Sequence, residues 1–283
     1  MSAAMPIDPE ADLDPETGFE LRLLLEAIFQ RYHHDFRGYA SGSLYRRVLV
    51  ALRRFECATV SQLQHRVLHE PEVFGQLLRY LTVHVSELFR DPGYFRAIRR
   101  QVVPYLRTYP SIKVWVAGCA NGEEAYSLAI VLAEEGLLER TLIYATDINP
   151  DCLRTAESGA YDVDRFAGFS ESYLLAGGRG SLSDHYAARY GSAVLDRRLR
   201  KAILFADHSL ATDSAFAEVE LISCRNVLIY FDRALQERAL GVLSESLCHR
   251  GFLGLGPKET LRFSTHAAAF SELAADERIY QKR

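Results

Sequence analysis

Two glycines and two acidic residues stand together where an apolar run changes into a helical pattern. The stretch 113–124 reads KVWVAGCANGEE, so Gly118 and Gly122 form a turn, and Glu123 and Glu124 begin the helix that follows. In open parallel sheets, ligands bind at such carboxyl ends of strands. Because a plain strand-to-helix turn can also need glycine, the glycines alone leave a purely structural role open.

The two acidic residues bear on the kind of ligand that could bind there. A helix N-terminus attracts phosphate through its backbone N–H groups and its dipole, and Glu123 and Glu124 would repel a phosphate. The G-x-G-x-x-G spacing of dinucleotide-binding proteins is also absent. An adenosine ligand with a positive centre and no phosphate fits better, and S-adenosylmethionine has this chemistry. Glu123 is also explained as a favourable acid in a first helical turn.

Asp147 ends the next apolar run, TLIYATD. At this position an acidic side chain accepts hydrogen bonds from ribose hydroxyls, and the alternative role is the N-cap of a helix that starts near Pro150. Together with the glycine turn, Asp147 favours a nucleoside-binding α/β enzyme. A nicotinamide-dependent oxidoreductase would have the same architecture, and the acidic pair and the missing glycine spacing argue against it.

The elements that must position these residues fall into two parts of the chain. From Gly18 to about Leu81, apolar residues recur three and four apart, which predicts an all-helical module. After Pro104, short strands alternate with helices, which predicts a mostly parallel sheet covered on both faces. The predicted strands are KVWVAG, TLIYATD, AILFAD, EVELISC, FLGLG and RIYQK, and the predicted helices cover about 123–135, 150–157 and 233–248. Residues 161–200 are rich in Gly, Ser and Tyr and predict an insertion of short strands or loops.

The composition excludes several classes of protein. The chain has 283 residues, 48% hydrophobic and 25% charged, with a formal net charge of −4, which is unlike a globally basic nucleic-acid binder. Five widely separated cysteines exclude a disulfide framework and zinc-finger spacing, and no apolar run reaches the roughly 18 residues of a membrane span. We expect a cytoplasmic protein with free thiols, since the N-terminus is unlike a signal peptide and holds Asp8, Glu10, Asp12, Asp14 and Glu16.

Five longer stretches carry a family resemblance: LTVHVSELFRDPGYF, VWVAGCANGEEAYSLAI, YATDINPDCLRTAESGAYD, ISCRNVLIYFD and GFLGLGPKETL. In this order and at these separations they closely resemble the chemotaxis receptor methyltransferases, the CheR-type protein-glutamate O-methyltransferases. The resemblance covers essentially the whole chain. It implies an α/β fold, with a class I (Rossmann-like) S-adenosylmethionine methyltransferase domain at 105–283 that carries a small β-subdomain insertion at 161–200. This domain is preceded by a small all-helical N-terminal domain at 15–82 and by a linker at 83–104 that contributes to the site.

The resemblance also implies the reaction and the residues that serve it. S-adenosylmethionine would be the methyl donor and S-adenosylhomocysteine the product, without a metal, and a receptor glutamate would become a γ-methyl ester. The implied cofactor contacts are His84, Ser86, Arg90, Gly118, Glu124, Asp147, Ser209, Leu210, Arg225 and Asn226. The sequence departs from the family where His84 and Ser209 replace Asn, Ser86 replaces Thr, and Asn121 and Ala125 replace Thr and Pro.

Arg90 and Tyr230 are the two residues to which we assign catalysis. A glutamate side chain, whose ordinary pKa is about 4.3, is already ionised at neutral pH, so attack on a sulfonium methyl needs alignment and desolvation rather than a strong base. Arg90 can hold the carboxylate with a bidentate fork, and Tyr230 can set its ring and hydroxyl beside the methyl group. The structural alternatives are an ion pair of Arg90 with Asp91 or another carboxylate, and a core position for Tyr230.

The segment 43–55 is basic, with no acidic residue between Arg37 and Arg54. Positions seven apart share a helix face, so the four arginines of this segment form a stripe: Arg46, Arg47, Arg53 and Arg54. A solvated surface is the usual explanation of a charge run, but the resemblance favours docking to a chemoreceptor. The expected partner is the cytoplasmic helical bundle of a methyl-accepting chemoreceptor, with no nucleic acid and no direct membrane insertion, and we expect a monomer.

A second class of function stays open, a non-catalytic regulatory module that keeps the pocket as a cofactor sensor and binds a receptor-like partner. The departures at His84, Asn121 and Ser209 leave room for it. In some family members the β-subdomain tethers a receptor C-terminal peptide, and AGGRGSLSDHYAARYG does not align clearly with that form. We interpret His185 in this stretch as a surface residue rather than a metal ligand. GPKETL replaces the family's more usual G-H-S-E-S-L.

Overall fold

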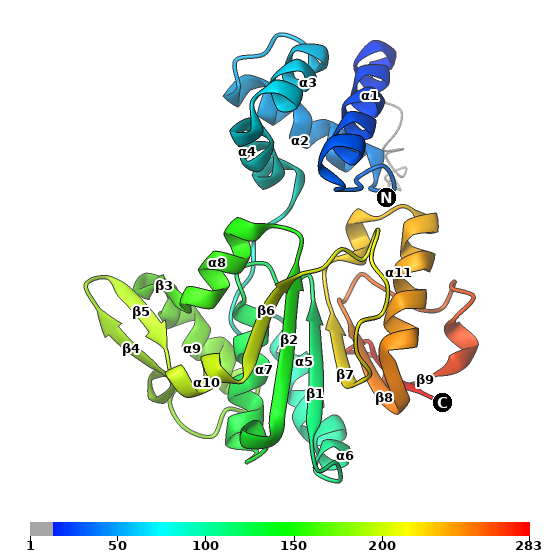
Figure 1. The fold of residues 1–283 in the computed structure, drawn as a ribbon. Coiled ribbons are helices and arrows are strands. Elements are labelled where there is room, and N and C mark those ends of the chain that lie inside the picture. Colours follow the sequence, from blue (N-terminus) through cyan, green and yellow to red (C-terminus); the bar gives the residue numbers. More distant parts are fainter. Residues whose placement is uncertain (1–13) are drawn as a thin grey trace, which may run out of the picture. The chain divides into compact units, whose positions relative to one another are not determined.

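A computed structural model describes residues 14–283, which divide into two units (Figure 1). The first unit holds the residues up to Val83 and the segment Tyr230–Gln236, and the second holds His84–Ile229 and Glu237–Arg283. The division falls one residue after the predicted end of the helical module. Three of the acidic residues expected to mark the N-terminus, Asp8, Glu10 and Asp12, lie outside the described part.

The first unit is helical, as predicted. Its helices are α1 (Pro15–Tyr32), α2 (Ser41–Arg54), α3 (Val60–His69) and α4 (Pro71–Leu81). Local chemistry sets their starts, because Asp14 and Thr59 accept backbone N–H groups as N-caps, and Pro15 and Pro71 occupy first helical positions. The segment Tyr230–Gln236 joins this unit through an antiparallel bridge between Tyr39 and Phe231.

The second unit is built on a seven-stranded sheet. Its first five strands in spatial order are parallel, and each of the last two strands pairs antiparallel with the strand before it. This confirms the mostly parallel sheet. In spatial order the strands are β6 (Ile203–Asp207), β2 (Thr141–Asp147), β1 (Ile112–Ala117), β7 (Val219–Cys224), β8 (Leu247–Leu255), β10 (Ile279–Lys282) and β9 (Phe270–Ala274). The sequence pattern did not predict β9, whose FSELA lacks a β-branched residue.

Helices connect and flank these strands. They are α5 (Pro92–Ala97), α6 (Val103–Leu106), α7 (Glu123–Glu134), α8 (Pro150–Ser158) and α11 (Arg233–Ser246), with a π-helical stretch at Ile98–Val102 and short 3₁₀ helices at Leu138–Arg140, Leu228–Tyr230 and Ala267–Ala269. The expected linker at 83–104 is irregular only as far as Asp91, and from Pro92 onward it is helical and part of the second unit. No helix within residues 14–283 combines the length and the apolar character needed to cross a membrane.

The insertion contains more helix than the sequence predicted. Its three-stranded antiparallel sheet has the order β3 (Ala160–Asp162), β5 (Ser192–Leu195), β4 (Tyr186–Arg189). Between β3 and β4 lie the 3₁₀ helices Val163–Arg165 and Leu182–His185 and a ten-residue helix, α9 (Phe166–Leu175), and α10 (Arg197–Lys201) follows β5. The expectation of strands or loops alone was wrong for α9, because Phe166, Phe169 and Tyr173 recur on one buried helix face despite the Gly and Ser residues between them.

Glu134 at the end of α7 ties the insertion to the larger sheet domain. Its carboxylate accepts hydrogen bonds from Tyr173 and Arg99, and His185 Nε2 lies 3.7 Å from it. Burial alone would raise the pKa of Glu134, but the nearby His185 and the hydrogen bonds from Tyr173 and Arg99 lower it to about 2. The His185 side chain is only 15% exposed, so the interpretation of His185 as a surface residue was wrong.

Neighbouring leucines on α1 give a test of the packing of the first unit. Leu24 is fully buried and Leu23 is 44% exposed. We expect Leu24→Ala to lower the free energy of unfolding by about 3 kcal/mol, because a cavity remains, and Leu23→Ala to lower it by less than about 1 kcal/mol. Denaturant unfolding of the two variants measures this difference. Because both variants replace leucine by alanine on the same helix, the change in helix propensity is the same in each. Equal losses would contradict the packing described for α1.

Candidate active site

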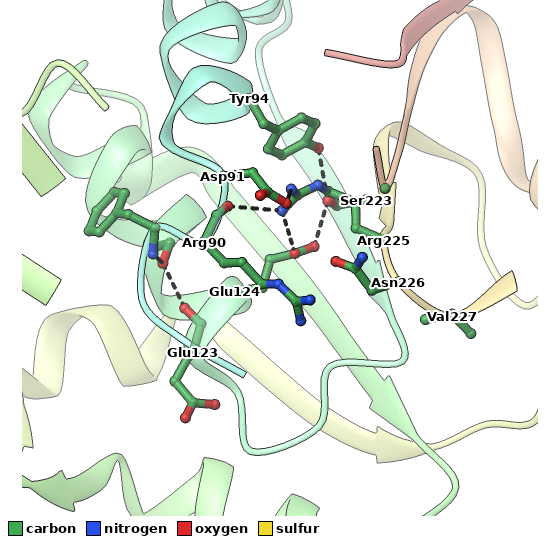
Figure 2. A network of polar contacts seen from close by, with 12 residues as sticks. Arg90, Asp91, Tyr94, Glu123, Glu124, Ser223, Arg225, Asn226 and Val227 are labelled. Atoms are coloured by element: carbon green, nitrogen blue, oxygen red, sulfur yellow. Dashed lines mark hydrogen bonds and ion pairs between the residues drawn. The ribbon is translucent and has the colours of Figure 1, made fainter. Parts of the chain in front are cut away.

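Three parallel strands end side by side, and half of the predicted cofactor contacts lie at these ends or at the start of the following helix. Gly118 follows β1, Asp147 is the last residue of β2, and Arg225 follows β7. In a parallel sheet these ends meet at one edge. The tertiary structure thus brings together residues that are far apart in the sequence (Figure 2).

The glycine turn after β1 requires glycine at both positions. Gly118 has φ +72°, and a Cβ there would lie 2.5 Å from Val227 Cγ2. Gly122 has φ +92°, and a Cβ there would lie 2.7 Å from the Cβ of Ala156. Both the conformation and the close approach therefore exclude larger residues. Gly118 itself is exposed, at the edge where the cofactor is expected.

Asp147 organises the backbone beside this turn. Its carboxylate accepts N–H groups from Ala120 and Asn149, each at 2.9 Å. Burial raises the pKa of Asp147, and these backbone hydrogen bonds oppose that rise. Asn149 is the N-cap of α8, so the N-cap alternative for Asp147 was wrong. Since a carboxylate offers about four acceptor positions, Asp147 can also accept hydroxyl groups of a ribose.

Arg225 is the centre of a buried ion-pair network. Its side chain is 1% exposed, and its guanidinium contacts Glu124 Oε2 at 2.9 Å and Asp91 Oδ2 at 2.7 Å. It also donates to the Arg90 carbonyl at 3.3 Å and lies 4.2 Å from the centre of the Tyr94 ring. Figure 2 shows these groups converging between the segment before α5, helix α7 and the end of β7. Arg225 therefore joins three elements of the site.

Glu124 receives a second donor from this network. The Ser223 hydroxyl donates to Glu124 Oε1 at 2.6 Å, and Tyr94 Oη lies 2.8 Å from the Ser223 oxygen. Glu124 was predicted as a cofactor contact, and in the structure both of its oxygens are already engaged by protein groups. Further acceptor positions on the carboxylate remain for an amino group.

Arg90 differs from Arg225 in that its charge is not paired. Within residues 14–283 its guanidinium is in no ion pair, and its one hydrogen bond is a 3.5 Å contact with the Val85 carbonyl. The alternative ion pair with Asp91 was wrong, because Asp91 pairs with Arg225. Phe89 and Asp91, on either side, have φ of +58° and +56°, a conformation that is uncommon outside glycine.

The segment that begins at His84 makes three further contacts with its surroundings. His84 Nδ1 lies 2.8 Å from Cys152 Sγ, and the His84 carbonyl accepts the side-chain amide of Asn121 at 3.1 Å. The Ser86 carbonyl accepts a hydrogen bond from Arg165 of the insertion. These contacts place His84 beside the glycine turn and α8, and Ser86 beside the insertion.

Glu123 has a larger role than that of an acid in a first helical turn. It is fully buried, and its Oε1 accepts a hydrogen bond from Arg165 Nη1 at 3.0 Å. Burial raises the pKa of Glu123, and the backbone and Arg165 oppose the rise. The acid therefore links the start of α7 to the insertion rather than facing solvent.

Comparison with known proteins decides the family. The profile described as "CheR methyltransferase, SAM binding domain" matches residues 84–279, and "CheR methyltransferase, all-alpha domain" matches residues 20–82. The chain belongs to the CheR methyltransferase family. It is therefore an S-adenosylmethionine-dependent methyltransferase with the fold and helical domain that the sequence predicted, and the oxidoreductase alternative is excluded.

Two sequence relatives agree with this assignment. A Pseudomonas putida protein named Cher3 is 58% identical over 94% of this chain and 97% of its own length. A Listeria monocytogenes protein named "Chemotaxis protein methyltransferase" is 28% identical over 80% of this chain and 84% of its own. Among solved structures, the N-methyltransferase NodS from Bradyrhizobium japonicum covers 70% of this chain and 87% of its own, at 14% identity and a TM-score of 0.37.

Two other predicted cofactor contacts of this CheR methyltransferase follow β6. The Ser209 backbone N–H donates to Asp213 Oδ2 at 2.8 Å, and the Ser209 hydroxyl accepts the N–H of Ala211 at 3.3 Å. Leu210 is 6% exposed. Their contact with adenine stays a prediction. Among residues 14–283 no three His, Cys, Asp or Glu side chains are grouped to hold a metal ion, and within the same residues none of the five cysteines forms a disulfide.

Tyr230, the second predicted catalytic residue, falls in the first unit. Its carbonyl accepts the N–H of Ala40 at 2.8 Å, and its ring centre lies 4.8 Å from the guanidinium carbon of Arg47. The role of Tyr230 in catalysis stays a prediction.

Sequence reasoning passed over two acidic residues of the site, Asp91 and Glu259. Asp91 was considered only as a partner of Arg90, and Glu259 only as part of a replaced motif. Glu259 is 4% exposed, and its carboxylate accepts four backbone N–H groups. An acidic residue shortly after an apolar strand could have been noticed as a ligand for nearby backbone groups, as Asp147 was.

The Arg225 network predicts a dependence between two substitutions. We expect Arg225→Met to lower the free energy of unfolding by about 3–5 kcal/mol, because it leaves Glu124 with an unpaired charge in a mostly buried position. Adding Glu124→Gln should restore more than about 1 kcal/mol, since that charge is then absent. Denaturant unfolding of both variants measures this. A double variant no more stable than Arg225→Met would show that the loss has another cause.

Proposed function

We propose that this CheR methyltransferase transfers a methyl group to the side-chain carboxylate of glutamates in a chemoreceptor-type signalling protein, forming γ-glutamyl methyl esters in the cytoplasm. The observation that carries the proposal is the guanidinium of Arg90, which is in no ion pair within the described residues and lies at the carboxyl edge of the sheet. Relatives named chemotaxis protein methyltransferase support the choice of acceptor.

The chemistry asks little of the protein beyond alignment. S-adenosylmethionine, when bound, supplies a methyl group activated by its sulfonium. An acceptor glutamate is already ionised at neutral pH, so its oxygen takes the methyl group without any proton being moved. The protein must orient this carboxylate and exclude water. Arg90 suits that task because a guanidinium binds a carboxylate through two parallel hydrogen bonds. Arg225 is less suited because Asp91 and Glu124 already occupy its two terminal nitrogens and its side chain is 1% exposed.

The residues at the strand ends fit the cofactor. Gly118 and Gly122 allow the turn after β1 to pack closely against Val227 and Ala156, and Asp147 retains acceptor positions for ribose hydroxyls. Glu124 places an acidic group near the turn, which favours a cofactor with a sulfonium and an amino group and disfavours a phosphate. These observations support the assignment of cofactor binding to this edge of the sheet.

Helix α2 is the proposed docking surface for the receptor. Arg46, Arg53 and Arg54 are exposed, and α2 contains no acidic residue. Arg47 differs, because it is half-buried and donates to the Leu81 carbonyl at 2.7 Å, and burial lowers its pKa. We therefore keep docking for Arg46, Arg53 and Arg54 and assign Arg47 a structural role in the first unit.

Substitution of Arg90 tests the catalytic part of the proposal. We expect Arg90→Ala to lower receptor methylation at least about 100-fold, because positioning of the reacting groups supplies much of the rate, while the melting temperature is unchanged. Arg90→Lys, which keeps the charge and loses the fork, should fall between the two. The measurement is base-labile release of labelled methanol from a cytoplasmic receptor fragment incubated with labelled S-adenosylmethionine.

Two results would change this view. Near-normal turnover by Arg90→Ala would remove Arg90 from the mechanism. If the unaltered protein bound the cofactor and the receptor but released no methanol, it would be the non-catalytic sensor that the sequence left open.

Charge reversal on α2 tests docking separately. We expect Arg46→Glu with Arg53→Glu to raise the KM for the receptor roughly tenfold at low salt, because an attractive surface becomes repulsive, without changing the affinity for S-adenosylhomocysteine. A matched control is Arg96→Glu with Arg100→Glu, two exposed arginines of the second unit, which makes the same change in net charge. An equal effect of both pairs would show that net charge, not α2, controls binding.

A further inference from the structure

A buried carboxylate from the turn after β8 holds the turn after β7. Glu259 Oε2 accepts the N–H of Asn226 at 3.0 Å and of its own Gly256 at 2.6 Å. Glu259 Oε1 accepts the N–H of Val227 at 2.8 Å and of Ile229 at 3.3 Å. Both carboxylate oxygens therefore serve two donors each, and three of the four donors belong to the turn after β7.

This turn needs an acceptor from outside for its backbone N–H groups. Asn226 has φ +60°, a conformation that asparagine adopts more readily than other residues with a side chain. A turn of this kind leaves buried backbone N–H groups without strand or helix partners, and each such group must be satisfied by another acceptor. Glu259 supplies that acceptor from the neighbouring strand, because the ends of β7 and β8 are paired in parallel at Cys224 and Leu255.

The same turn reaches the glycine turn after β1. Val227, whose N–H is held by Glu259, places its Cγ2 where a Cβ of Gly118 would be 2.5 Å away. Gly256 is similarly constrained, since a Cβ there would lie 2.7 Å from Glu259 Oε2 and 2.8 Å from the Asn226 nitrogen. A change at Glu259 can thus be passed through Val227 to the backbone around Gly118.

We propose that Glu259 is a positioning residue of the cofactor site, which holds Asn226 in its left-handed conformation and keeps Val227 packed against Gly118. The inference rests on the cofactor-binding part of the proposed function and not on the identity of the methyl acceptor. Its test therefore uses S-adenosylhomocysteine alone, so failure of a receptor assay leaves it standing.

Glutamine is the informative substitution because it has the shape of glutamate but accepts hydrogen bonds through only one oxygen. In Glu259→Gln the amide nitrogen would face two backbone N–H donors, and those donors would lose their acceptor. Glu237 on α11 offers a matched control. Its contacts with the Ser264 hydroxyl and the Thr265 N–H all use Oε1, so a glutamine there keeps its acceptor.

Calorimetric titration with S-adenosylhomocysteine separates positioning from general stability, since it reports Kd and the fraction of binding-competent protein independently. We expect Glu259→Gln to raise Kd at least about tenfold with a stoichiometry near one, and Glu237→Gln to leave Kd unchanged. An unchanged Kd in Glu259→Gln would overturn the proposal, whether or not the competent fraction falls. A merely structural role would lower that fraction and not the affinity.

A second substitution covers the case in which Glu259→Gln does not fold. Gly256→Ala keeps the carboxylate and displaces it through the added Cβ, so it should also raise Kd, and an unchanged Kd in that variant would overturn the proposal as well.

The route through Val227 is tested by Val227→Ala, alone and in combination with Glu259→Gln. Where Glu259→Gln does not fold, Gly256→Ala takes its place in the combination. If Glu259 acts through Val227, the combined change in binding free energy is smaller than the sum of the separate changes. Full additivity would contradict the route.

Discussion

The site of this CheR methyltransferase depends on the burial of one guanidinium. A charge with 1% exposure is tolerated only when opposite charges pair with it, and Arg225 meets this requirement by contacting Glu124 and Asp91 at once. Glu124 begins α7 and Asp91 precedes α5, so the pairing fixes both segments against the end of β7. The Tyr94 ring and the Ser223 hydroxyl complete the enclosure. The backbone carbonyl of Arg90 is held by the same group.

This use of one arginine leaves another available. Because Asp91 is committed to Arg225, it does not neutralise its neighbour Arg90, whose guanidinium can meet an incoming carboxylate. The first unit repeats the division of roles, since Arg47 is half-buried against Leu81 and Tyr230 while Arg46 stays exposed. Whether an arginine supports the fold or faces a ligand is set by the acceptors around it, not by its residue type.

Carboxylates also organise the backbone at the strand ends. Asp147 accepts two N–H groups after β1 and β2, and Glu259 accepts four after β7 and β8. Loops at an active site have no ladder or helix to satisfy their buried donors. An acidic side chain from an adjacent strand end satisfies several donors at once and fixes the loop shape. The glycines at 118 and 122 then allow the neighbouring segments to approach closely.

The sequence by itself determined the family, the helical module followed by a mostly parallel sheet, and the strand ends where Gly118, Asp147 and Arg225 lie. These features are local, because side-chain periodicity and strand-end residues are visible in short stretches. Only the tertiary structure decided that Arg225 pairs with Asp91, which lies 134 positions away, that Arg47 is half-buried, that α9 forms within the insertion, and that Glu259 serves another strand's turn. Pairing and burial depend on which distant segments meet, and a carboxylate or guanidinium has the same appearance in a sequence whether its partner is a backbone, a counter-ion or a substrate.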